Sequence, residues 1–315
     1  MNRTVKEIGK KVVSLLPTKP WLSWQFKKKF GRNINWKNPT TFNEKLQWLK
    51  VYDRKPIYTT MVDKYEAKKY VADIIGEEYI IPTLGVWDRF EDIDFDALPD
   101  QFVLKCTHDS GGLVIVRNKA DFDKEAARKK FKIAMNRNPY DVTREWPYKN
   151  VKPRIIAEQY MDDGEVVDKA DQSEAVTCER LQSEHGLLDY KFLCFNGKAR
   201  VLFLDIGVIG GGEDHAENYY RNVYDQNGIE MPFKETREHY PIPVLLPDNF
   251  KEMVNVAEEL SKGIACLRVD LYRLNSGEIK VGELTFFHGS GMSNIFVPEE
   301  WDRTLGDWIT LPEKG

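Results

Sequence analysis

The chain has 315 residues, and 46 lysines and arginines stand against 50 aspartates and glutamates, which leaves a formal net charge of −4. This length suits two domains or one large α/β domain, and the charge gives no overall basic field for binding nucleic acid. No run approaches the roughly 20 apolar residues of a membrane span. The four cysteines lack metal-binding spacing, so we expect reduced thiols and a cytoplasmic protein.

Residues 1–40 are basic and have helical periodicity. Pro17 and Pro20 are expected to end a first helix. The next segment, Trp21–Phe30, alternates aromatic residues with lysines. Such a pattern suits a peripheral contact through residues 1–30 with anionic lipid at the inner face of the membrane, or with a membrane-bound partner. The alternative is an ordinary helix that packs on the domain with its lysines in water.

The next hundred residues predict helices followed by strands. Thr41-Phe42-Asn43-Glu44 has the form of a capping box and predicts the start of a helix. A second helix is expected over 63–75, and a strand with a turn over 80–87. Residues 91–100 are acidic and predict a surface connection.

A lysine lies inside an apolar strand, Phe102–Thr107, and the loop Ser110-Gly111-Gly112 follows before a second strand. Together these segments predict a hairpin whose tip can bind phosphates through backbone N–H groups. Burying Lys105 in a strand is costly unless the ammonium meets an anion. The alternative places Lys105 at a sheet edge that faces water.

The middle of the chain alternates short strands and helices. We expect, in order, a helix over 121–135, a strand over 154–161, an irregular excursion over 165–186, a hairpin at Asn196-Gly197, a loop over 207–218, a hairpin near Asn227-Gly228 and a helix over 250–262.

Two runs with strand composition flank Asn275-Ser276-Gly277 and predict a further hairpin. With the turn centred between the serine and the glycine, Asp270 lies opposite Glu283, and their Cβ atoms are about 4.5–5.5 Å apart. Arg268 shares the Asp270 face, and Thr285 shares the Glu283 face. Two such carboxylates suit a hard divalent cation. A solvated cross-strand salt bridge is the alternative.

The glycine-rich run Phe286–Gly291 follows this hairpin and carries His288 and Ser290. A turn of this composition at the end of a carboxylate-bearing strand suits anion binding. It therefore favours a functional site over a surface salt bridge.

The order of these segments resembles the ATP-grasp superfamily, in particular its TupA-like branch in bacterial teichuronopeptide and polysaccharide biosynthesis. The resemblance covers roughly residues 40–305 and implies an α+β ATP-grasp fold. Two α+β subdomains would clasp ATP between antiparallel sheets. The implied domains are an N-terminal helical extension (1–58), a small lid subdomain (59–157) and a large subdomain with the magnesium and acceptor site (158–315).

The resemblance also implies which residues bind ATP. They are Lys105 and Lys191 for the phosphates, Ser110, Gly111 and Gly112 for the loop that closes over them, Glu158, Gln159 and Met161 for adenine, and Asp189 for the ribose hydroxyls.

Magnesium would be held by Asp270 and Glu283, as the resemblance implies. Thr285 stands where many family members have asparagine, so a second ion would bind more weakly. Arg268 would stabilise charge on the acceptor carboxylate, and His288 would line the acceptor end. Together with Lys105, the last two residues are the expected catalytic groups.

The implied activity is that of an ATP- and Mg²⁺-dependent carboxylate–amine ligase, which forms an acyl phosphate and attaches an amino acid or amine in capsule or other surface polysaccharide biosynthesis. Its partners would be a small-molecule or glycan carboxylate acceptor and an amine donor, with no nucleic acid, and residues 1–30 could contact the polysaccharide-assembly machinery.

Three alternatives stay open. A sugar or glycan kinase would share the ATP half of the site. Asp92-Ile93-Asp94 has the Asp-x-Asp form of a nucleotide-sugar glycosyltransferase, although no apolar strand leads into it. A non-enzymatic scaffold would leave Lys105 and the paired acids without a purpose.

Overall fold

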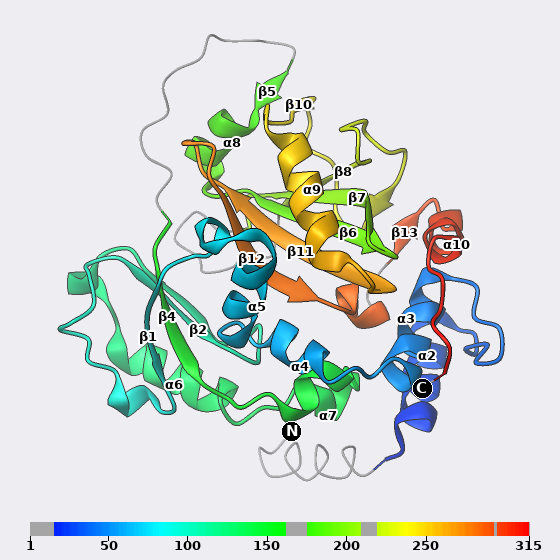
Figure 1. The fold of residues 1–315 in the computed structure, drawn as a ribbon, viewed down its shortest axis with the longest axis horizontal. Helices are drawn as coiled ribbons and strands as arrows, with labels where there is room; N and C mark the ends of the chain where they lie inside the picture. The colour runs from blue at the N-terminus through cyan, green and yellow to red at the C-terminus, as the bar shows by residue number, and fades with distance from the viewer. Residues whose placement is uncertain (1–15, 162–174, 209–218, 293–294, 315) are drawn as a thin grey trace.

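The computed structural model describes residues 16–161, 175–208, 219–292 and 295–314. Two antiparallel sheets with helices packed around them form the body of the molecule (Figure 1). The smaller sheet has the order β1-β4-β2-β3 and contains β1 (Thr83–Trp87), β2 (Phe102–Cys106), β3 (Leu113–Val116) and β4 (Ile155–Gln159). Its apolar face packs on α6 (Lys124–Ala134).

The larger sheet has the order β12-β11-β6-β7-β8. Its strands are β6 (Asp189–Phe195), β7 (Lys198–Ile206), β8 (Tyr220–Tyr224), β11 (Cys266–Arg273) and β12 (Ile279–Thr285). Helix α9 (Phe250–Ser261) covers one face of this sheet (Figure 1). The main core forms around it and includes side chains of α3 (Phe42–Tyr52), α4 (Ile57–Val62) and α5 (Glu66–Ile75).

Shorter elements complete the fold. Two small pairings join β5 (Val176–Thr177) to β10 (Val244–Leu245) and β9 (Lys234–Glu235) to β13 (Phe296–Val297). The remaining helices are α2 (Thr18–Phe30), α7 (Tyr140–Thr143), α8 (Cys178–His185) and α10 (Glu300–Asp307), with 3₁₀ turns η1 (Glu77–Tyr79), η2 (Phe90–Asp92), η3 (Lys119–Asp121), η4 (Trp146–Asn150) and η5 (His288–Gly291). No helix within the described ranges is both long and apolar enough to cross a membrane.

Several local predictions are confirmed. The capping box is present, because the Thr41 hydroxyl accepts from the Glu44 N–H at 3.3 Å and the Glu44 carboxylate accepts from the Thr41 N–H at 3.4 Å. The hairpin between β6 and β7 turns through Asn196 and Gly197, both with positive φ, as a tight two-residue turn requires. The domain boundaries at residues 58 and 157 stay predictions.

Other predictions are wrong in part. Pro20 lies in the first turn of α2 rather than ending a helix, since the first N–H groups of a helix need no partner. The helix expected before Pro17 falls outside the described residues. Within the excursion expected over 165–186, α8 forms because the Thr177 hydroxyl caps it and Cys178 and Leu181 share a buried face.

Two further connections differ in extent from expectation. The hairpin expected near Asn227-Gly228 forms but is short: after a turn over 225–229 the chain pairs with β8 through the bridge between Tyr224 and Glu230, and the Met231 N–H donates to the Val223 carbonyl at 2.8 Å. The acidic connection over 91–100 is exposed at its carboxylates, yet Ile93 and Phe95 are buried in the core of the smaller sheet.

Candidate active site

The hairpin of β11 and β12 places Asp270 directly opposite Glu283, as predicted. The turn is centred on Ser276, half a residue before the predicted centre between Ser276 and Gly277, since Arg273 pairs with Ile279. A β-bulge at Gly282 then shifts the register by one residue and restores the predicted pair. Without it, Asp270 would face Gly282, and Glu283 would point to the other side of the sheet.

Arg268 lies between the two acids and contacts both. Its Nε and Nη2 atoms each donate to Asp270 at 2.6 Å, and Nη2 also approaches a Glu283 oxygen at 2.8 Å. The same Nη2 lies 3.2 Å from the Thr285 hydroxyl, which donates to Glu283 at 2.9 Å. Burial raises the pKa of Asp270 against the opposing effect of Arg268. Burial would also raise the pKa of Glu283, but neighbouring cations, Lys64 first, hold it well below its usual range.

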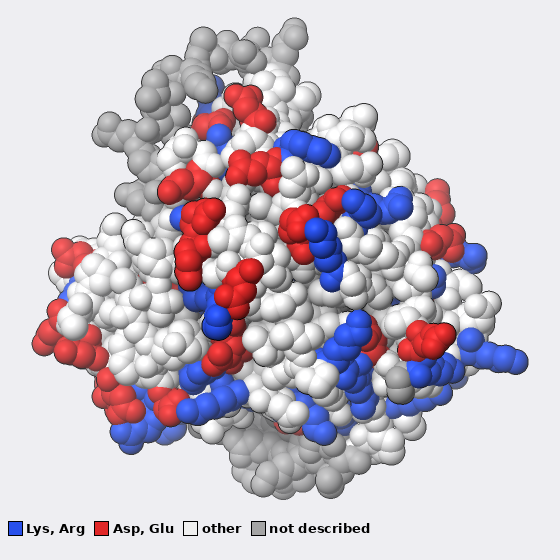
Figure 2. Space-filling model, viewed as in Figure 1, with Lys and Arg blue, Asp and Glu red and all other residues white. Residues whose placement is uncertain are grey.

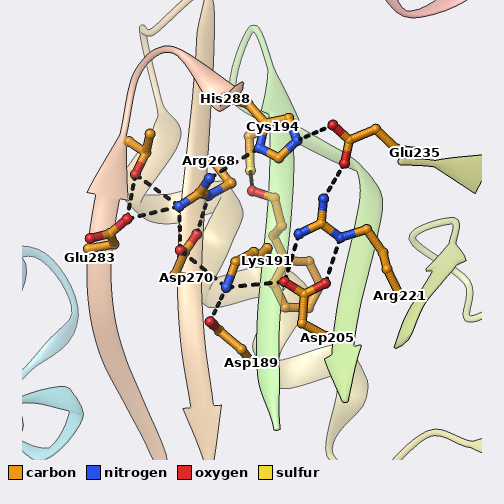
Figure 3. A network of polar contacts seen from close by, with 12 residues as sticks. Asp189, Lys191, Cys194, Asp205, Arg221, Glu235, Arg268, Asp270, Glu283 and His288 are labelled. Atoms are coloured by element: carbon orange, nitrogen blue, oxygen red, sulfur yellow. Dashed lines mark hydrogen bonds and ion pairs between the residues drawn. The ribbon is translucent and has the colours of Figure 1, made fainter. Parts of the chain in front are cut away.

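A closed ring of polar contacts extends from Arg268 across the sheet (Figure 3). In order, its members are Arg268, Asp270, Lys191, Asp205, Arg221, Glu235 and His288, and His288 returns to Arg268. Asp189 joins the ring through Lys191. Burial alone would lower the pKa of Lys191, but the surrounding carboxylates raise it well above its usual range. Each charge in the ring therefore has an opposite charge beside it.

His288 is held in one tautomer. Arg268 can only donate, and its Nη1 lies 3.1 Å from His288 Nδ1, so the imidazole proton is on Nε2. That nitrogen lies 3.3 Å from a Glu235 oxygen, and the ring stacks on Phe203 at 5.1 Å. Burial lowers the pKa of His288, although Glu235 opposes the effect. His288 is therefore a neutral acceptor toward Arg268 in this structure.

The smaller sheet brings a second group of charges to the same region. Lys105 lies on the internal strand β2, and its side chain is 17% exposed. The alternative prediction, which placed Lys105 at a sheet edge facing water, is therefore wrong. The Lys105 ammonium contacts Glu158 at 2.6 Å, and Lys68 contacts the other oxygen of that carboxylate at 2.6 Å. Lys64 reaches across to Glu283 at 3.3 Å. Lys105 thus meets an anion, as its burial predicts.

A cavity of about 470 Å³ is lined from both sheets. The predicted residues on its wall are Lys105, Ser110, Gly112, Asp189, Lys191, Arg268, Asp270, Glu283 and His288. These residues come from distant parts of the chain, and the fold brings them together around one space.

Five predicted residues are not among the described residues that line this cavity: Gly111, Glu158, Gln159, Met161 and Thr285. Thr285 lies just behind the cavity wall, in contact with Arg268. The side chain of Glu158 faces Lys68 and Lys105, while Gln159 borders a separate hollow beside Leu84. The adenine contacts expected of residues 158–161 stay a prediction.

The Asp-x-Asp stretch does not join the site. Asp92 pairs with Arg89 on the surface, while Ile93 is buried in the core of the smaller sheet. The described wall of the cavity contains neither Asp92 nor Asp94. The two aspartates therefore point to solvent from a turn that Ile93 anchors in the core, and the described residues give a glycosyltransferase site no support.

Sequence reasoning missed several charged residues of the site, namely Lys64, Asp109, Asp205, Arg221, Glu235 and Arg237. Asp205 carried a usable signal, because an acid ends the apolar run of β7, as Lys105 interrupts that of β2. Glu235 lies on a two-residue strand, and no local pattern marks it.

Comparison with known families places these residues in context. The family model described as TupA-like ATPgrasp matches residues 44–310. A search of curated proteins found no match.

Three solved structures that match this chain in part are one synthetase and two ligases. D-cycloserine synthetase DcsG is 16% identical with a TM-score of 0.40, covering 80% of this chain and 71% of its own. An L-amino acid ligase from Bacillus licheniformis is 14% identical with a TM-score of 0.46, covering 91% and 57%. D-alanine–D-alanine ligase from Bacillus anthracis, complexed with ATP, is 20% identical with a TM-score of 0.35, covering 72% and 55%. The present chain thus spans less than two thirds of the two ligases.

Proposed function

Because this chain belongs to the TupA-like ATP-grasp family, whose model spans residues 44–310, and has the α+β ATP-grasp fold, we propose that it is an ATP- and Mg²⁺-dependent ligase that joins an amine to a carboxylate through an acyl phosphate. The main support is the meeting of Lys105 with Asp270 and Glu283 around one cavity. Phosphoryl transfer depends on positioning and charge neutralisation, so this chemistry needs no nucleophilic side chain.

The donor set fits magnesium and nucleotide. Asp270 and Glu283 offer the hard oxygen ligands that Mg²⁺ prefers, and the bulged hairpin places both acids on one face, while the Thr285 hydroxyl supports Glu283 from behind the wall. Bound there, the ion would neutralise charge on the phosphates. Asp189 Oδ1 is buried and has no hydrogen-bond donor among the described residues, so it can accept from a ribose hydroxyl.

The chain's own cations have distinct tasks under this proposal. Lys105 and Lys191, on opposite sheets, bind phosphate oxygens. Arg268 donates to the acceptor carboxylate as negative charge builds on it. His288 accepts from Arg268 and fixes the direction of the guanidinium. Because each cation already has a carboxylate partner, it is oriented before substrate arrives.

The substrate class extends from the family resemblance. We propose a carboxylate of a bacterial surface polysaccharide, or of its precursor, as the acceptor, and an amino acid or other amine as the donor. The reaction would take place in the cytoplasm, where ATP is supplied.

Thermal unfolding with and without MgATP tests the nucleotide site. At about 100 times its dissociation constant the ligand should add about 2.7 kcal/mol, a shift of about 5 °C in the parent. Lys105→Ala and Glu283→Gln should lose the shift, whereas the exposed control Lys251→Gln should keep it. No shift with either Mg²⁺ or Mn²⁺ would contradict the proposal.

The products separate a ligase from a kinase. ADP and free phosphate that appear only when acceptor and amine are both present indicate a ligase. A phosphorylated sugar would instead identify a sugar or glycan kinase, which shares the same nucleotide half.

A further inference from the structure

One side of α2 has a chemistry that the proposed reaction does not use. Leu22 and Phe26 are fully buried against the body, which fixes the opposite side of the helix toward solvent. On that side Trp24 is 54% exposed and stacks on Trp21, with ring centroids 5.2 Å apart. The indole therefore keeps a fixed outward position.

Further apolar side chains reach the same place from α7 and from the chain before α2. Leu16 and Val142 are each 43% exposed. The Trp21 indole N–H donates to the Val142 carbonyl at 2.8 Å, and Arg144 donates to the Leu16 carbonyl at 3.0 Å. These bonds hold the two segments against α2. We call Leu16, Trp21, Trp24 and Val142 the α2–α7 surface.

Positive charge borders the α2–α7 surface. Lys27 and Lys28 follow Trp24 by three and four residues and lie on its side of α2, Lys29 follows at the end of the helix, all three are exposed, and the helix contains no acidic residue. Lys28 lies over the Trp24 ring at 5.3 Å. None of the three lysines has a carboxylate partner among the residues that the structure describes. Figure 2 shows several lysine and arginine side chains, together with some acidic ones, at the lower right, the region where α2 lies in Figure 1.

We propose that the α2–α7 surface docks the protein on a bilayer that contains anionic lipid. Tryptophan favours the boundary between headgroups and acyl chains, and adjacent lysines are attracted to anionic headgroups. The whole chain carries −4, so an anionic membrane repels most of its surface and selects this basic edge. The proposal does not depend on the reaction, because the α2–α7 surface lies outside the cavity wall.

Flotation with vesicles of POPC alone and of POPC with 30% POPG tests the full-length protein. We expect binding to the anionic vesicles only, and release in 0.5 M NaCl. Each lysine near an anionic surface is worth about fivefold in affinity, so Lys27→Gln/Lys28→Gln/Lys29→Gln should weaken binding on the order of 100-fold. Trp24→Ala should weaken it about tenfold.

The matched control removes three exposed lysines elsewhere, Lys129→Gln/Lys132→Gln/Lys251→Gln, and should bind like the parent. Circular dichroism checks that every variant is folded. Equal binding to both vesicle types, binding to neither, or a triple α2 variant that binds as tightly as the control would each overturn the proposal. MgATP-induced stabilisation should be unchanged in the α2 variants, so this test and that of the ligase proposal fail separately.

Discussion

Replacing Glu235 by glutamine tests whether the charge ring stabilises the fold. Glu235 is buried between Arg221 and His288. Burial alone would raise the pKa of Glu235, but His288, which becomes charged as the pH falls, and the Arg221 guanidinium lower it from 4.5 to about 2. One pKa unit corresponds to 1.36 kcal/mol, so the carboxylate contributes at most about 3 kcal/mol at pH 7, where His288 is neutral and Arg221 carries the effect. Glu235→Gln should lose stability of about that size.

The sign of the pH dependence follows from the lowered pKa. The folded protein holds the Glu235 proton less tightly than the unfolded chain, so the contribution is complete above about pH 4.5 and disappears as pH falls through about 2. Urea unfolding followed by tryptophan fluorescence measures it. At pH 3 roughly half of the difference between parent and variant should remain.

A matched control is Glu238→Gln, three residues along the chain. The Glu238 side chain is 75% exposed and pairs with Lys234, so its loss should leave the free energy of unfolding almost unchanged. The reasoning is refuted if Glu235→Gln is as stable as Glu238→Gln at pH 7. A loss of unfolding free energy in Glu235→Gln that is as large at pH 3 as at pH 7 would also refute it, since the loss would then arise from side-chain packing rather than from the charge.

Three further predictions concern other parts of the structure. Glu158→Gln leaves Lys68 and Lys105 without their shared carboxylate and should cost about 3–5 kcal/mol in urea unfolding, whereas the exposed Glu91→Gln should change little. Gly197→Ala forces a methyl group onto a residue with φ +79° and should cost about 1–2 kcal/mol; an unchanged unfolding midpoint would contradict the turn geometry. Lys64→Ala should reduce the thermal stabilisation by MgATP, and full stabilisation would remove Lys64 from the proposed site.

Local sequence patterns predicted the half of the site that lies on β11 and β12. Alternation along each strand and a turn centred between Ser276 and Gly277 predicted that Asp270 pairs with Glu283, and the pair forms, but from a turn centred half a residue earlier. The bulge at Gly282 was not predicted, although it is what sets that pairing. A glycine inside a strand is a known sign of a bulge, but the sequence does not reveal which way the register shifts.

The other half of the ring depends on contacts that no local pattern carries. Arg221 and Asp205 meet only because β8 pairs with β7, and Glu235 reaches them through a two-residue strand. Helix α8 was missed for a related reason, since eight residues give too few turns for a clear period. The resemblance to a family supplied the fold where periodicity alone could not.

The closed ring also bears on how quickly an anionic ligand finds the cavity. Its three cations, Arg268, Lys191 and Arg221, are matched by Asp270, Asp205 and Glu235. At physiological ionic strength the Debye length is about 8 Å, and beyond it a compensated ring has almost no field. The ring should therefore add little electrostatic steering, and its contribution to association rates should depend only weakly on salt. The charges of the ring act only when the ligand is in contact with them, where an anionic group of the ligand can replace a carboxylate as the partner of a ring cation.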